Sequence, residues 1–154
     1  MNLLAGSTGF LGSKILNELS LSQNKTLALS RRMINTLPKN TEQLIIDFKK
    51  LSELELPQID HVFLSLGYPL LFHNVMGIMN NNLKKNLFLV DFTYQLEIAK
   101  KAKDAGAKKI SIISAVGADP HSWNYYLKTK GMVEKEIISI GFDSTNIFQP
   151  GHLR

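Results

Sequence analysis

The chain has 154 residues, 44% hydrophobic and 20% charged, which is the composition of one globular domain large enough to bury a core. It contains no cysteine, which excludes a disulfide framework and thiol catalysis. The formal net charge is +5, but the lysines are scattered near expected helix ends and turns without a recognition motif, so we expect no nucleic-acid partner.

The N-terminus shows no export or membrane signal. Its apolar run ends at Gly6, and no stretch approaches the length needed to span a bilayer. We therefore expect a cytoplasmic protein with no membrane partner. No spacing of His, Asp and Glu indicates a metal site, so we expect no bound metal.

The first expected strand, residues 1–5, runs directly into three glycines, Gly6, Gly9 and Gly12, and a helical pattern covers residues 9–20. This order is typical of a dinucleotide site. One glycine allows the tight turn, one lets backbone amides approach the pyrophosphate, and one lets the helix pack close to its strand. A simple strand-to-helix turn is the alternative, since a glycine triplet alone has low specificity.

The rest of the chain alternates between apolar runs and helical patterns. The expected strands are residues 25–30, 44–46, 60–66, 109–114 and 144–148. The expected helices after the first are residues 87–105 and 123–139, with Ser122 as the N-cap of the latter. Nearly continuous apolar strands separated by helices predict an α/β fold, a doubly wound parallel sheet with helices on both faces. The stretch 68–86 follows a strand end and is either a substrate loop or lid, or simply disordered.

The second expected strand ends in Ser30-Arg31-Arg32, with no carboxylate to accept hydrogen bonds from the ribose 2′-hydroxyl of NAD. A guanidinium can bind a 2′-phosphate, so this ending favours NADP(H) over NAD(H), unless both arginines are solvated turn residues. Asp47 and Phe48 close the third strand and suit an adenine, the carboxylate toward the exocyclic amine and the ring against the base. Asp after a strand is also a common turn residue.

The expected chemistry lies at Tyr126 and Lys130, which share one helix face at i and i+4. A nearby ammonium favours the tyrosinate, so we expect Lys130 to lower the pKa of the phenol from about 10 toward neutrality. Ser114 ends the fifth strand, where its hydroxyl could hold a substrate oxygen beside the phenol. Packing of both side chains along the helix is the alternative.

Taken in order, these residues and Pro150-Gly151 resemble the atypical short-chain dehydrogenase/reductases. The similarity is to the small branch that contains the Tat-interacting protein and bacterial sugar-epimerase-like oxidoreductases. In that branch a Val-Asp opens the long helix, like Val90-Asp91, and a Tyr-x-x-x-Lys-Gly leads to a Glu, like Glu134. The resemblance runs the length of the chain and implies a Rossmann fold that binds NADPH, with Ser114, Tyr126 and Lys130 as the catalytic triad.

The resemblance also implies the residues that contact the cofactor. These are Gly6, Thr8, Gly9, Phe10, Leu11, Gly12, Arg31, Arg32, Asp47, Phe48, Leu66, Gly67, Lys130 and Pro150. Relatives often carry a second hydroxyl residue after Ser114, where this chain has Ala115. They also continue well beyond residue 154. The resemblance therefore implies one NAD(P)-binding domain, residues 1–154, without the C-terminal segment that covers the substrate side of the cleft in relatives.

Three functions follow as expectations. The first is an NADP(H)-dependent oxidoreductase or epimerase-like enzyme that acts on a small-molecule substrate. The second is a non-catalytic NADP(H)-binding sensor or protein-interaction module. The third is an inert shortened paralogue. Such folds often form homodimers through helices like residues 87–105 and 123–139, which makes a homodimer a further expectation.

Overall fold

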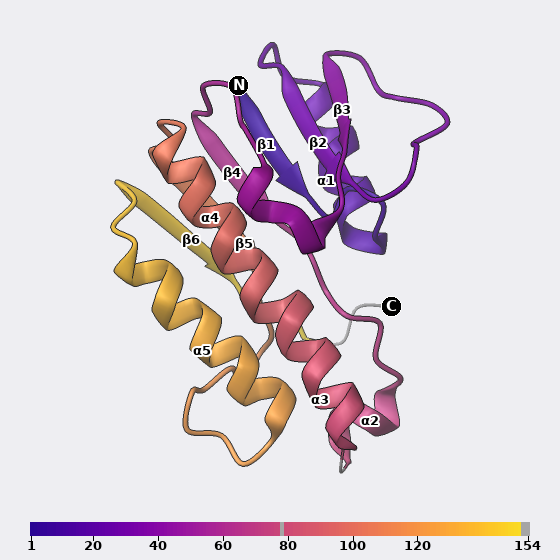
Figure 1. Ribbon diagram of the computed structural model, residues 1–154, viewed down its shortest axis with the longest axis vertical. Helices are drawn as coiled ribbons and strands as arrows, with labels where there is room; N and C mark the ends of the chain where they lie inside the picture. The colour runs from indigo at the N-terminus through magenta and orange to yellow at the C-terminus, as the bar shows by residue number, and fades with distance from the viewer. Residues whose placement is uncertain (78, 152–154) are drawn as a thin grey trace.

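Six parallel strands form one sheet in the order β3-β2-β1-β4-β5-β6 in the computed structural model, which describes residues 1–77 and 79–151 (Figure 1). The chain builds outward from β1 to β3 and then returns to place β4 against the other edge of β1. The strand order therefore reverses between β1 and β4, where doubly wound sheets bind their ligands. The expected fold class is confirmed.

The strands are β1 (Asn2–Ala5), β2 (Thr26–Ser30), β3 (Thr41–Ile45), β4 (His61–Leu64), β5 (Lys109–Ile113) and β6 (Ser144–Phe148). The helices are α1 (Phe10–Ser20), the 3₁₀ helix η1 (Phe48–Glu53), α2 (Phe72–Met76), α3 (Asn81–Phe88), the π-helical turn η2 (Leu89–Tyr94), α4 (Gln95–Asp104) and α5 (Tyr125–Ser139). Within the described ranges, no helix combines the length and the apolar character needed to cross a bilayer.

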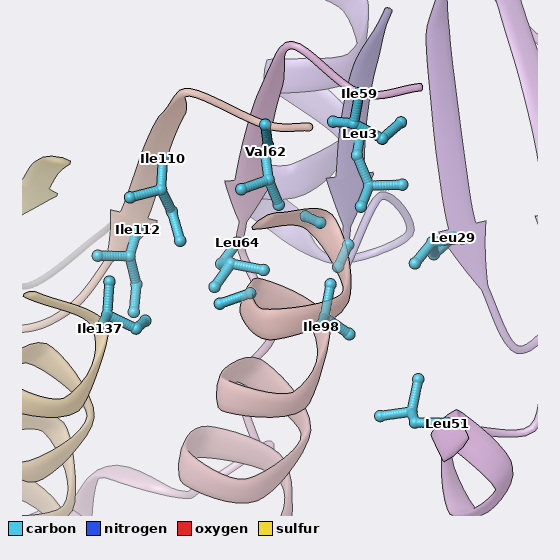
Figure 2. Packing of buried hydrophobic residues seen from close by; sticks show 14 of the residues in the cluster. Leu3, Leu29, Leu51, Ile59, Val62, Leu64, Ile98, Ile110, Ile112 and Ile137 are labelled. Atoms are coloured by element: carbon cyan, nitrogen blue, oxygen red, sulfur yellow. The ribbon is translucent and has the colours of Figure 1, made fainter. Parts of the chain in front are cut away.

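The main core lies between the sheet and the layer formed by α4 and α5, which run side by side across one face (Figure 1). Alternate strand residues supply it, because successive side chains of a strand point to opposite faces. Leu64 and Ile112 point from β4 and β5 toward Ile98 of α4 and Ile137 of α5 (Figure 2). Burial of these branched side chains fixes the two helices, and with them the elements that continue toward the site.

The opposite face carries α1, which packs Leu16 against Leu4 of β1 and Ala28 of β2. The intervening strand residue Leu3 belongs to the main core, which is the alternation expected of a strand buried on both faces. Because α1 starts directly after the glycine turn, this packing aims its N-terminus at the carboxyl end of β1.

The stretch 68–86 contains α2 and most of α3, so the expectation that it is simply disordered is wrong, while its role as a substrate loop stays a prediction. The long helix begins at Asn81 and not at residue 87, since the side chain of Asn80 caps it by accepting a hydrogen bond from the Leu83 N–H (2.9 Å). From α3 the helix continues through η2 into α4. A π-helical turn inside a long helix often marks a functional position.

Candidate functional site

A cleft of about 590 Å³ opens at the carboxyl ends of β1, β4 and β5, at the reversal of the strand order. The glycine turn, the segment after β4, the loop after β5 and the start of α5 form its walls. The predicted site residues that line it are Gly9, Phe10, Leu11, Leu66, Gly67, Ser114, Tyr126, Lys130 and Pro150. Residues far apart in the sequence thus meet where a ligand is expected.

The glycine turn is held tight by close backbone contacts. Gly6 has φ +92°, and a Cβ on it would lie 2.5 Å from the Ser65 carbonyl oxygen. A Cβ on Gly12 would lie 2.0 Å from the Gly6 carbonyl oxygen, so α1 can begin here only with glycine at that position. Gly9 is the N-cap of α1 and has no side chain to cap the helix, which leaves its first N–H groups beside the cleft.

The turn of α5 that carries Tyr126 and Lys130 is positioned from both ends. Asn124 is the N-cap, its Oδ1 accepting from the Leu127 N–H (3.1 Å), so the expectation that Ser122 caps this helix is wrong. A Cβ on Gly131 would lie 2.3 Å from the Asp119 carbonyl carbon. Only glycine at position 131 therefore lets the loop after β5 lie against α5.

Tyr126 and Lys130 share one face of α5, as predicted, with Lys130 Nζ 5.7 Å from the centroid of the Tyr126 ring. Ser114 follows β5 directly and is buried at the cleft, its N–H donating to the Phe148 carbonyl (2.7 Å). Within the part of the chain that the structure describes, the Ser114 hydroxyl has no hydrogen-bond partner. A buried hydroxyl without a partner is costly, and in a cleft it is suited to a ligand oxygen.

Asp91 is the site residue to which sequence reasoning gave no role. It lies on η2 and forms a buried ion pair with Lys130, Oδ1 to Nζ 2.5 Å, the two side chains being 2% and 5% exposed. Its Oδ2 accepts from the Tyr68 N–H (2.7 Å), which ties the segment after β4 to the same carboxylate. Gln95 donates to the Leu66 carbonyl (3.3 Å) and to the Asp91 carbonyl (3.0 Å). The signal for Asp91 was a lone acidic residue in an apolar helical segment, since a buried charge requires a partner.

The expected direction of the Tyr126 pKa is wrong. Burial raises the pKa of the phenol above its ordinary value of 10.0; Lys130 opposes that rise, and the Asp91 carboxylate adds to it. Lys130 does not dominate because its ammonium is paired with Asp91 rather than directed at the phenol oxygen alone. Without a ligand, Tyr126 is therefore a neutral phenol that can donate a proton.

This direction is measurable in the protein without cofactor. Because the shift is upward, the phenol stays protonated below its ordinary pKa and ionises only above it. We expect an ultraviolet difference titration of wild type against Tyr126→Phe to reveal no tyrosinate from Tyr126 below about pH 10. A tyrosinate signal near neutral pH that the variant lacks would contradict this result and restore the original expectation.

Arg31 and Arg32 lie outside the cleft lining, exposed in the turn after β2. Gln43 of β3 shapes this turn, its Nε2 donating to the Arg32 carbonyl (2.7 Å) and to Ser30 Oγ (2.6 Å). This bracing of the arginine turn by Gln43 was not anticipated from the sequence. The turn follows β2 at the carboxyl edge of the sheet, and β1 and β4 lie between β2 and β5, the strand that Ser114 follows.

The expectation that the Phe48 ring lies against an adenine is wrong. Phe48 is 6% exposed, belongs to the main core and packs against Tyr94 with ring centroids 5.6 Å apart. Asp47 uses its carboxylate to accept from the Lys49 N–H (2.9 Å), which caps η1. Of the other predicted cofactor residues, Thr8 is exposed on the turn, while Gly6 and Gly12 shape that turn without lining the cleft.

Comparison with known proteins gives relatives along almost the whole chain, although no family model matches the sequence. It is 31% identical to the protein FMP52, mitochondrial, of Eremothecium gossypii over 98% of this chain and 65% of that protein. It is also 31% identical to the rat protein HTATIP2, over 97% of this chain and 61% of that protein. The chain therefore spans slightly less than two thirds of the length of these relatives.

Solved structures share the fold at lower identity. The structure of MoeE5 in complex with UDP-glucose and NAD is 19% identical with a TM-score of 0.73, over 95% of this chain and 52% of that one. The serine dehydrogenase of Escherichia coli is 17% identical with a TM-score of 0.77, over 97% of this chain and 81% of that one. At these identities the likeness establishes the fold.

The comparison also corrects the expected location. The FMP52 relatives from Eremothecium gossypii, Kluyveromyces lactis and Scheffersomyces stipitis are all named as mitochondrial proteins. The expectation of a cytoplasmic protein is contradicted by this finding. It rested on the lack of an export signal, which does not distinguish the cytoplasm from an organelle.

Proposed function

We propose that this chain, which belongs to the atypical short-chain dehydrogenase/reductase-like branch that contains FMP52 and HTATIP2, is an NADP(H)-dependent oxidoreductase or epimerase-like enzyme. Its proposed substrate is a small-molecule carbonyl or alcohol. The fold and the relatives support the coarser statement, an oxidoreductase-like protein that binds a nicotinamide dinucleotide. The observation that carries the proposal is one cleft in which the glycine turn, the unpartnered Ser114 hydroxyl and the Tyr126–Lys130 pair meet.

The residues present fit a nicotinamide dinucleotide. The uncapped N-terminus of α1 would hold the pyrophosphate, because its N–H groups and the helix dipole favour an anion. The contacts of Gly6 and Gly12 leave no room for a side chain within the turn, which allows close approach of the backbone. MoeE5, which shares this fold, is described in complex with NAD. The cleft then continues past Leu66 and Gly67 toward Ser114 and Tyr126.

In the proposed mechanism, hydride transfer to a carbonyl carbon or from an alcohol carbon is the chemistry that a nicotinamide dinucleotide would supply when bound. Tyr126 donates the matching proton from its hydroxyl to the carbonyl oxygen, and takes it back in the reverse direction. Ser114 holds the same oxygen through its free hydroxyl. Lys130 would bind the nicotinamide ribose, as the family resemblance implies, and it acts electrostatically on the phenol, while Asp91 holds the ammonium in place.

The proposed preference for NADP(H) rests on Arg31 and Arg32. Both are exposed at the carboxyl end of β2, and the residue that closes the strand is Ser30, not an acid. The Gln43 hydrogen bonds hold the backbone of this turn, so the guanidinium groups are presented from a defined position. A planar guanidinium matches a 2′-phosphate and makes charge-assisted hydrogen bonds to it.

Arg32→Ala is expected to weaken NADPH binding about 10- to 100-fold and NADH binding little, because hydrogen bonds to a charged group contribute roughly 1.5–3 kcal/mol. Isothermal titration with both cofactors measures the two losses. Lys135→Ala, which removes an exposed cation of α5 outside the cleft, is the matched control. Equal losses for NADPH and NADH would show that the 2′-phosphate is held elsewhere or not at all.

A thermal-shift comparison of NADPH, NADP⁺, NADH and NAD⁺ tests the proposal as a whole, because a ligand that binds the native state raises the melting temperature. Preferential stabilisation by NADPH or NADP⁺ is the expected result. If no dinucleotide stabilises the protein, the proposal fails. Binding without turnover of any carbonyl or alcohol would instead favour the sensor or interaction function.

A homodimer through α4 and α5 stays a prediction.

A further inference from the structure

The part of the cleft beyond Ser114 and Tyr126 has an apolar lining. Leu70, Val75 and Met76 line it from the segment after β4, and Val116 and Leu127 line it from the loop after β5 and from α5. Among the described residues, the only charged side chains that line the cleft are Asp91 and Lys130. These are buried and paired with each other at 2.5 Å, so they offer no unpaired charge to a substrate.

One polar side chain at this end of the cleft, that of Asn124, is already engaged within the protein. Asn124 uses Oδ1 to cap α5 and donates from Nδ2 to the Val75 carbonyl (2.6 Å). The first bond occupies a donor at the N-terminus of α5 that could otherwise bind a phosphate. The second fixes α2 against α5, so that Val75 and Met76 form a positioned wall of the cleft.

The mouth of the cleft is also apolar. Phe10, Met76 and Val116 line it and are 58%, 70% and 62% exposed. Large apolar side chains that gather around one concave site, instead of being scattered singly, mark a surface that is covered when a ligand binds.

We propose that the substrate of this cleft is an apolar carbonyl compound or the corresponding alcohol, with an aliphatic or aromatic substituent that lies between α2 and the loop after β5. The inference rests on the proposed function and narrows its substrate class. A sugar linked to a nucleotide, like the UDP-glucose bound by MoeE5, would need cations or free hydrogen-bonding groups where this cleft presents Leu70, Met76 and Val116. Reduction of the carbonyl consumes one hydride from the reduced dinucleotide and one proton, delivered by Tyr126, and yields the alcohol.

The test is turnover of a homologous series of methyl ketones, from butanone to decanone, by the full chain with NADPH. Each methylene buried in the cleft is expected to raise kcat/KM by up to about fourfold, equivalent to about 0.8 kcal/mol, until the apolar wall is covered. Glyceraldehyde 3-phosphate with NADPH and UDP-glucose with NADP⁺ are the polar comparison substrates. We expect little or no turnover of either.

Met76→Glu places a charge on the proposed wall and is expected to lower kcat/KM for decanone by about tenfold, mainly through KM, with an unchanged Kd for NADPH. Ile138→Glu, an equally drastic change at a position of α5 that is 58% exposed and outside the cleft, is the matched control. A flat response to chain length, preference for the polar substrates, or no effect of Met76→Glu would overturn the substrate assignment while dinucleotide binding stood. Failure of any dinucleotide to stabilise the wild-type protein would instead overturn the proposed function and this inference with it.

Discussion

Tyr126→Phe is expected to lower kcat about 10²- to 10⁴-fold, the usual contribution of a positioned general acid. The variant keeps the ring that lines the cleft and loses only the hydroxyl proton that the proposed mechanism delivers to the carbonyl oxygen. Cofactor affinity should change little, because the expected pyrophosphate contacts lie at the start of α1 and not on α5. Steady-state turnover of the preferred ketone, with a parallel titration of NADPH, measures both quantities.

Tyr125→Phe is the matched control, since it makes the same change one residue earlier on the same helix. The Tyr125 ring faces Lys84, whose Nζ lies 5.4 Å from the ring centroid, and Tyr125 does not line the cleft. We expect this variant to retain most of the wild-type activity. If Tyr126→Phe were as active as Tyr125→Phe, the phenol of Tyr126 would not be the proton donor.

The centre of the sheet could be predicted from the sequence because β1 and β2 are buried on both faces and therefore show as nearly continuous apolar runs. The run 144–148 matches β6 at both ends, and residues 25–30 match β2 within one residue. The start of the long helix could not be located in this way. Residues 80–86 are rich in Asn and Lys, and only the hydrogen bond from the Leu83 N–H reveals Asn80 as a cap.

It was also predictable that Ser114, Tyr126 and Lys130 would lie beside one cleft. Tyr126 and Lys130 are separated by one helical turn, and Ser114 lies one loop before their helix. The environment of these residues was not predictable. Asp91 precedes Lys130 by almost forty residues, so the sequence does not reveal that the two side chains form an ion pair. It therefore does not reveal that burial has the largest effect on the Tyr126 pKa. The position of the Phe48 ring could not be predicted for a related reason, since an aromatic side chain after a strand can point either toward a ligand or toward the core.

The strongest expected effect on folding comes from Asp91→Ala, which should lower the free energy of unfolding by about 3–5 kcal/mol, the usual cost of leaving one charge of a buried pair without its partner. The substitution leaves the ammonium of Lys130, whose side chain is 5% exposed, without its partner, and it removes the acceptor of the Tyr68 N–H. Equilibrium unfolding in urea measures the loss.

Asp91→Asn separates the two roles of this carboxylate, because an amide oxygen can still accept from the Tyr68 N–H but carries no charge for Lys130. The double variant Asp91→Ala/Lys130→Met removes both charges, and it should be more stable than Asp91→Ala alone, since an apolar side chain in that place leaves no buried ion. If the effects of Asp91→Ala and of Lys130→Met alone on the free energy of unfolding instead added up to that of the double variant, Asp91 and Lys130 would not form the ion pair on which the position of the ammonium depends. In that case only the contacts of α5 with the loop after β5 would position Tyr126 and Lys130. Nothing described for Asp91 would then keep the Lys130 ammonium beside Tyr126.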